Sequence, residues 1–234
     1  MIQTSDGHKI RSFSVHLRSG NSDELCSSIL SLAWVNEHII ATECHINPSL
    51  SEYVETDVRT GKSGRDLLGF DFKPAPDAST VAHVGWIIHF ARPPEQSYYL
   101  QFDEKIVYPL PRGKKPFKQR HLDRGPLVVT KKGDTYTGIH EFAPGFSWSP
   151  DSKHLAFIDC TFDWTSDDEA SQSPIGERSY QSCSLIVIDR NGKYSQFPDS
   201  CRDVETYQNS SIQWTAANSL VLYAHGILRK ITIR

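Results

Sequence analysis

The chain has 234 residues, of which 38% are hydrophobic and 11% aromatic, enough apolar material for a core. Its formal net charge of −3 argues against a general nucleic-acid-binding surface, which needs a basic field. No run of about twenty apolar residues occurs, so no membrane span is predicted. No segment sustains the apolar spacing of a long helix.

The first repeat-like segment covers residues 30–62. Trp34 precedes a short polar turn and the apolar strand at 39–41, and a second strand at 52–58 runs into a turn that contains Gly61. Alternating apolar and polar residues with glycine at the turn are typical of antiparallel hairpins. We therefore predict two hairpins in this segment.

The second segment covers residues 70–110 and contains a Pro-Asp turn. Pro76 pre-sets φ in that turn, and the Asp77 side chain can accept hydrogen bonds from the backbone that follows it. A further hairpin is predicted to join the strand at 98–103 to the strand at 106–108.

The third segment, residues 146–197, is the most regular. Phe146 and Trp148 alternate towards one face before a second Pro-Asp turn, Pro150-Asp151. An Asn-Gly pair between later apolar runs is the strongest short hairpin signal. Two hairpins per segment give four antiparallel strands, which is one propeller blade.

The segments are related to one another. Aligning Pro76 on Pro150 shifts the numbering by 74 and places Phe72 on Phe146. A weaker copy at residues 211–233 lacks the Pro-Asp turn. Self-similarity on this scale predicts a repeat architecture. The residues that carry the repeat are Trp34, Phe72, Pro76, Asp77, Phe146, Trp148, Pro150, Asp151 and Trp214.

The pattern aromatic-x-W-S-P-D-x-x-x-[LIV]-A-F, followed by a strand that ends in Asp and a Gly-Lys turn, resembles the TolB-type β-propeller repeat. That repeat is related in shape to the WD repeat. The match is strong at residues 146–193, good at 70–108 and partial at 30–62 and 211–233. Ser152 departs from the pattern, which usually has glycine there.

The resemblance implies an all-β fold in a single domain, residues 1–234. The expected architecture is a β-propeller or partial propeller of about four to five four-stranded antiparallel blades. The blade-like units lie near residues 30–62, 70–110, 146–197 and 211–233. In a small complete propeller, a strand from Ile10 to Leu17 would complete the last blade.

The alignment also predicts roles for individual side chains. The tryptophans Trp34, Trp148 and Trp214 occupy related positions and are expected to be buried. Three aspartates end equivalent strands and are interpreted as turn formers. They are Asp57, Asp103 and Asp189.

The cellular compartment depends on the true start of the chain. The polar N-terminus is not typical of a signal peptide. The protein is expected in the cytoplasm if Met1 is the natural start. If a leader has been removed, the resemblance to a bacterial family favours the periplasm.

Two segments, 111–126 and 161–182, match no blade and are interpreted as insertions, one basic and one acidic. Because function is concentrated on loops, they are candidate sites for a protein partner. The alternative is a solvated linker and a solvated loop. The candidate residues are Asp163, Trp164, Asp167, Asp168, Glu169, Arg112, Lys114, Lys115, Lys118 and Arg120.

No metal site or cofactor is predicted, because the ten histidines and five cysteines lack the C-x₂-C and H-x₃-H spacings of zinc ligands. Cys160 and Cys183 bracket the acidic insertion, and a bridge between them would clamp its base. The alternative is that all five cysteines are small buried residues.

These observations favour a non-enzymatic β-propeller binding module that meets a protein partner through loops on one face, in an undetermined oligomeric state. The nucleophile elbow G-x-S-x-G of hydrolases is absent. One alternative is a carbohydrate-active enzyme with paired carboxylates, for which Asp71, Asp77 and Asp151 are the acids to consider. Another is a propeller fragment of a larger, peptidase-associated protein.

Overall fold

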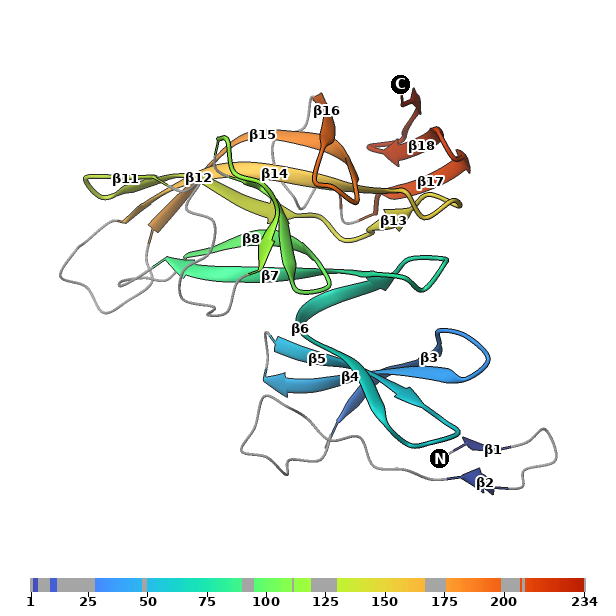
Figure 1. Cartoon of the computed structure of the whole chain (residues 1–234). Helices are drawn as coiled ribbons and strands as arrows, with labels where there is room; N and C mark the ends of the chain where they lie inside the picture. The colour runs from blue at the N-terminus through green and yellow to red at the C-terminus, as the bar shows by residue number, and fades with distance from the viewer. Residues whose placement is uncertain are drawn as a thin grey trace. The chain divides into compact units, whose positions relative to one another are not determined.

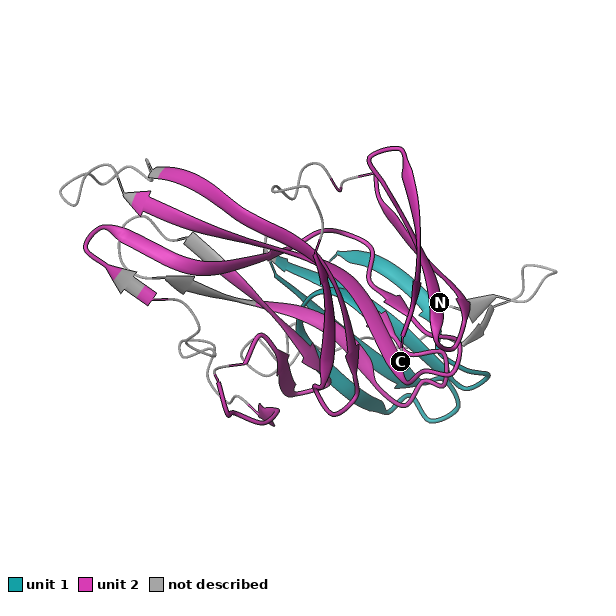
Figure 2. Cartoon of the chain, turned by 90° about the horizontal axis from the view of Figure 1, so that it is seen from above, with its two compact units in different colours: residues 1–72 teal, residues 73–234 magenta. Residues whose placement is uncertain are grey.

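The strands of this protein pair antiparallel, so the all-β class is confirmed (Figure 1). The chain divides into two compact units, Met1–Phe72 and Lys73–Arg234 (Figure 2). The computed structural model describes residues 2–3, 9–11, 28–47, 50–89, 95–110, 112–118, 130–166, 176–198, 207 and 209–233.

The first unit contains a meander in which neighbouring strands follow chain order. A separate pair, β1 (Ile2–Gln3) and β2 (Lys9–Arg11), form their own two-stranded sheet. The strand β2, which contains Ile10 and Arg11, therefore pairs with β1 and not with the last sheet, and residues 12–17 lie outside the described residues. The meander strands are β3 (Ile29–Trp34), β4 (Ile39–Asn47), β5 (Leu50–Asp57) and β6 (Ser63–Pro74), the last of which crosses the unit boundary.

The described part of the second unit contains three groups of neighbouring strands. Its first meander contains β7 (Val81–His89), β8 (Glu95–Phe102), β9 (Lys105–Tyr108) and β10 (Phe117–Lys118). The next contains β13 (Ser147–Trp148), β14 (His154–Ser166), β15 (Gly176–Asp189) and β16 (Tyr194–Pro198). The last contains β17 (Ser211–Ala216), β18 (Ser219–Ala224) and β19 (Ile227–Thr232).

A hairpin between the two larger meanders was not foreseen. It is formed by β11 (Thr130–Lys132) and β12 (Thr135–Phe142). β12 pairs with β14 from Thr135↔Thr165 to Phe142↔Asp159, so β14 has a neighbour on each side. The sheet order is therefore β11-β12-β14-β15-β16, with β13 also on β14.

The two Pro-Asp turns have the same backbone. In the earlier turn, Ala75 N–H donates to the Thr80 carbonyl at 2.9 Å, and Ala78 N–H donates to the Ala75 carbonyl at 2.8 Å. Shifting each residue by 74 gives the later turn, in which Ser149 N–H donates to the His154 carbonyl at 2.8 Å and Ser152 N–H to the Ser149 carbonyl at 2.8 Å. The alignment made from the sequence is thus confirmed at these turns.

Ser152 stands where the TolB-type pattern usually has glycine, and its backbone gives the reason. Its φ is 60°, and the equivalent Ala78 has φ 55°. Both residues occupy the left-handed region, which glycine adopts without steric cost. The serine side chain links the two Pro-Asp turns, since its hydroxyl accepts a hydrogen bond from Asp77 N–H at 3.0 Å.

Two of the three strand-ending aspartates, Asp57 and Asp189, are turn formers as predicted, whereas the Asp103 side chain bonds to the start of β7. The Asp57 carboxylate accepts from Arg59 N–H at 2.8 Å, and the Asp189 carboxylate accepts from Asn191 N–H at 2.8 Å. The Asp103 carboxylate accepts from Val81 N–H at 3.0 Å. The Asn-Gly hairpin is also confirmed, with Gly192 at φ 82°.

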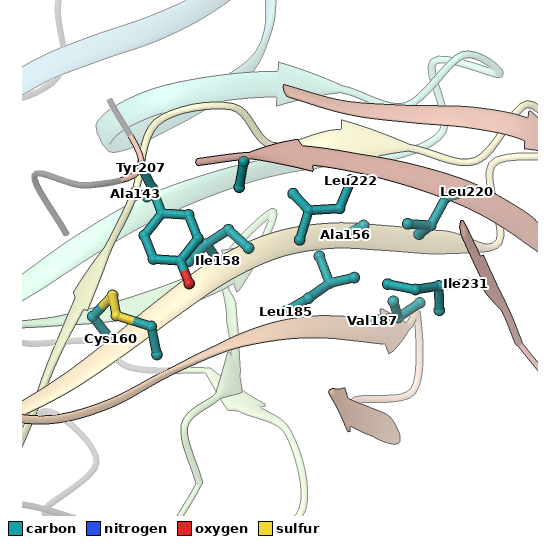
Figure 3. Close-up of a cluster of buried hydrophobic side chains, with 12 residues drawn as sticks. Ala143, Ala156, Ile158, Cys160, Leu185, Val187, Tyr207, Leu220, Leu222 and Ile231 are labelled. Carbon is teal, nitrogen blue, oxygen red and sulfur yellow. A yellow bond between two sulfur atoms is a disulfide. The ribbon is translucent and has the colours of Figure 1, made fainter. Parts of the chain in front are cut away.

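The core of the second unit lies between the long β14–β15 hairpin and the last sheet (Figure 3). Alternate residues of each strand face this cluster, because successive side chains point to opposite sides of a sheet. The disulfide Cys160–Cys183 and the ring of Tyr207 belong to it. The other buried members are Ala143, Ala156, Ile158, Leu185, Val187, Leu220, Leu222, Ala224 and Ile231.

The expectation that 161–182 is an insertion loop needs correction. Residues 161–166 extend β14 and residues 176–182 extend β15, paired from Thr161↔Ser182 to Ser166↔Gly176. The polar composition hid these strands, because their partly exposed residues do not need the apolar pattern of a core strand. Residues 167–175 lie outside the described residues.

The expected burial of the three tryptophans is correct for Trp148, which is 7% exposed, and only partly correct for Trp214, which is half-buried. It is wrong for Trp34, which is 56% exposed. The indole N–H groups of Trp148 and Trp214 each donate to a backbone carbonyl of an earlier strand, at Lys73 and at Ser147. Every residue of β3, which carries Trp34, is exposed.

Candidate functional site

The basic candidates form an exposed segment between β9 and β10. Arg112, Lys114 and Lys115 are exposed, and Lys118 on β10 forms an ion pair with Glu104. β10 pairs with β9 through Phe117↔Ile106, which attaches the end of the segment to the sheet. Arg120 lies outside the described residues.

The acidic candidates divide into two groups. Trp164 is 3% exposed and packs with Ile139 and Phe162 in a small cluster, so its side chain serves the core. The Asp163 carboxylate accepts from Gly138 N–H at 3.3 Å and from Gln181 Nε2 at 3.2 Å.

The remaining acidic candidates lie outside the described residues. They are Asp167, Asp168 and Glu169.

An arginine clamp joins the two Pro-Asp turns. The guanidinium of Arg190 donates to both carboxylate oxygens of Asp77, at 2.9 and 2.8 Å, and to the Ser152 carbonyl at 2.6 Å. Hydrogen bonds from Ser79, with a further contribution from Arg190, lower the pKa of Asp77 to about 2. Nη2 of Arg190 contacts both oxygens of Asp77 while Nε contacts Ser152, so the planar guanidinium holds the two turns in one relative geometry.

The carboxylates considered for an enzyme are thus largely accounted for. Asp77 is held in the clamp, and Asp151 accepts a hydrogen bond from the Ser149 hydroxyl at 2.7 Å within its own turn. That bond lowers the pKa of Asp151. Asp71 lies on β6 with φ 53°, and desolvation, with the nearby charge of Glu43 adding to it, raises the pKa of its carboxyl.

A buried polar cluster was not foreseen from the sequence. Tyr108 on β9 donates its hydroxyl to Asp159 Oδ2 on β14 at 2.6 Å, and Nδ1 of His140 on β12 lies 2.8 Å from the same oxygen. His140 N–H donates to the hydroxyl of Ser97 on β8 at 3.1 Å. The cluster therefore ties β8 and β9 to β12 and β14.

Burial dominates the electrostatics of this cluster. It raises the pKa of Tyr108 well above 10, and the Asp159 charge adds to the effect. The side chains of His140 and Asp159 are 13% and 4% exposed. A carboxylate that orients a histidine is also the pattern of general-base pairs. Here both groups join sheets inside an aromatic shell that includes Phe142 and Phe157, so we interpret the cluster as structural.

Comparison with known proteins does not assign this chain to a family. No family model, curated protein or solved structure matches it. The resemblance to TolB-type repeats therefore rests on the repeat residues alone.

Among the described residues, no group of three or more His, Cys, Asp or Glu side chains is placed to hold a metal ion. The same part of the chain contains no helix that is long and apolar enough to cross a membrane.

Proposed function

We propose that this protein is a non-enzymatic, propeller-type binding module that recognises an acidic surface of a partner protein through the basic segment 112–118. The observation that carries the proposal is a rigid, repeated scaffold beside an exposed cationic segment. The side chains of the repeat turns and of the paired strands are largely used in packing and hydrogen bonding within the fold. Arg112, Lys114 and Lys115 are exposed on a connection between two strands.

The physics of such a segment favours protein recognition. Binding residues are often carried on loops that a scaffold positions, and charged residues at an interface steer association and fix register. Arginine is enriched at protein interfaces, where it pairs with carboxylates in a bidentate manner. Gly113, at φ 78°, lies in a turn of this segment between Arg112 and Lys114.

The disulfides support a compartment outside the reducing cytosol. Cys160 is bonded to Cys183, and Cys44 is also disulfide-bonded. Disulfides persist in oxidising environments such as the bacterial periplasm and are rare in the cytosol of mesophiles. The partner is therefore best sought among exported proteins.

A binding experiment with matched charge reversals tests the proposal. Immobilised wild-type protein is exposed to extracts of exported proteins at low and high salt, and bound proteins are identified by mass spectrometry. The variant Lys114→Glu/Lys115→Glu is expected to lose the partners that wild type retains. Raising the ionic strength should also release them, because exposed charge pairs are screened.

The control variant Lys132→Glu/Lys193→Glu reverses two exposed charges elsewhere in the same unit. It should retain the wild-type partners. The proposal is wrong if both variants bind alike. It is also wrong if wild type captures nothing and hydrolyses members of a glycan panel.

A further inference from the structure

Trp148 and Trp214 form the same hydrogen bond, from the indole N–H to a backbone carbonyl of an earlier repeat. Trp148 Nε1 donates to the Lys73 carbonyl at 2.8 Å. Trp214 Nε1 donates to the Ser147 carbonyl at 2.9 Å. Lys73 and Ser147 are equivalent positions under the shift of 74, so each indole reaches the same place on the preceding repeat.

Trp34 is the tryptophan of the first repeat and has an exposed indole on an exposed strand. Ile29, Leu30 and Leu32 on the same strand β3 are also more than half exposed. β3 is the terminal strand of its meander, paired with β4 on one side. An edge strand with four large exposed apolar residues is typical of a surface that binds another chain.

The last repeat exposes the complementary face. Val221 and Tyr223 on β18 and Leu228 on β19 lie on the side of that sheet opposite the core residues Leu220 and Leu222, because residues alternate across a strand. Tyr223 is paired directly with Leu228, and these side chains are 46% and 66% exposed. This is the face that a next repeat would cover.

Charge also favours a match between these two ends. Near β3, Glu37 in the following turn is strongly exposed and Glu43 lies on the neighbouring strand β4, whereas Glu55 and Asp57 are already ion-paired with Arg65 and Arg59. Residues 211–234 contain three basic side chains and no acidic one, and Lys230 is exposed on the outer face of β19. Opposite charges at the rim orient an encounter and select its register.

We propose that β3 of one copy of this chain docks on the outer face of the β17–β19 sheet of a second copy, as a further repeat would. Trp34 then donates its indole N–H to the carbonyl of Gln213, the residue that precedes Trp214 as Ser147 precedes Trp148. The contact continues the repeat interface already present within the chain. It is independent of the basic segment 112–118.

The two docking surfaces are different, so the contact is head-to-tail. Such contacts build rings when the rotation closes and open chains when it does not. They also allow a complementation test. A copy that has lost β3 can still offer its last sheet, and a copy that has lost its last sheet can still offer β3.

The test measures mass against protein concentration by sedimentation velocity, for the full chain with its disulfides intact. Wild type is expected to associate as concentration rises. Trp34→Ala and Tyr223→Ala/Leu228→Ala should each weaken self-association by about tenfold or more, as loss of a central apolar anchor does. A mixture of these two variants should recover a dimer that neither forms alone.

Control measurements separate docking from folding. Tyr194→Ala removes another half-exposed aromatic side chain, and this variant should associate as wild type does. All variants should keep the wild-type circular dichroism spectrum. A wild-type protein that stays monomeric at every concentration overturns the proposal, and so does a mixture that fails to form the dimer.

Discussion

The indole Nε1–H of Trp214 donates to the carbonyl oxygen of Ser147 at 2.9 Å. Ser147 immediately precedes Trp148, whose own indole donates to Lys73 one repeat earlier. The repeats that contain Trp148 and Trp214 are therefore each attached to an earlier repeat by a buried or half-buried tryptophan. The contact gives Trp214 a structural role in the last repeat, although that repeat lacks the Pro-Asp turn.

We predict that Trp148→Ala lowers the free energy of unfolding by about 3–5 kcal/mol, because it removes a large side chain from the core. Trp148→Phe should cost about 1 kcal/mol for the lost hydrogen bond, since it keeps the packing against Phe102. Urea unfolding of both variants measures these values. Trp34→Ala is the control and should lie within about 0.5 kcal/mol of wild type, as exposed substitutions do. An unchanged Trp148→Ala protein would contradict the repeat alignment.

Part of this architecture follows from the sequence because local chemistry determines it. Pro76 and Pro150 set the backbone of their turns, and Asn191 with Gly192 sets a hairpin, so these elements were predicted correctly. What covers a residue is not local. Trp34 fits the repeat pattern as well as Trp214 does, yet no sequence rule says whether a strand lies above it.

The polar cluster shows the same limit for the candidate site. Tyr108, His140 and Asp159 come from three strands separated by turns and an unforeseen hairpin, and no spacing between them forms a motif. Only the pairing of β12 with β14 brings His140 and Asp159 together. The signal available in the sequence was an aspartate, Asp159, inside the apolar run 155–160.

Stability should depend on pH through His83. Burial is the main cause that lowers the pKa of this side chain from 6.5 to about 4 in the folded protein. Between pH 4 and 6.5 the unfolded chain binds a proton at His83 that the folded protein does not bind. The free energy of unfolding therefore rises with pH in this range, and the contribution of His83 is lost as pH falls from 6.5 to 4. The loss should be on the order of 3 kcal/mol.

The variant His83→Gln can still donate to the Asp103 carbonyl, which His83 Nε2 contacts at 2.7 Å, and has no proton to gain. Its urea midpoint should change less than that of wild type between pH 6.5 and 4. Parallel pH profiles for the two proteins would show that His83 is not the group responsible.

The Cys160–Cys183 bond should stabilise the long hairpin and the core beneath the last sheet. It links directly opposed residues of β14 and β15 and closes a separation of 23 residues. Cys160→Ala/Cys183→Ala is expected to lower the free energy of unfolding by about 2–4 kcal/mol in guanidinium chloride.

Because Cys44 is also disulfide-bonded, a reductant acts on more than one bond in wild type. The double variant should therefore lose less stability than wild type when reductant is added. Equal losses in the two proteins would mean that the Cys160–Cys183 bond contributes nothing measurable.

The central claim is that successive repeats are joined by indole-to-carbonyl hydrogen bonds. Hydrogen exchange of the tryptophan Nε1–H groups, followed by NMR on a sample kept monomeric and assigned by single Trp→Phe substitutions, tests it most directly. The indole protons of Trp148 and Trp214 should exchange much more slowly than that of Trp34, because both are hydrogen-bonded between repeats. Exchange at Trp148 and Trp214 as fast as at Trp34 would contradict the account.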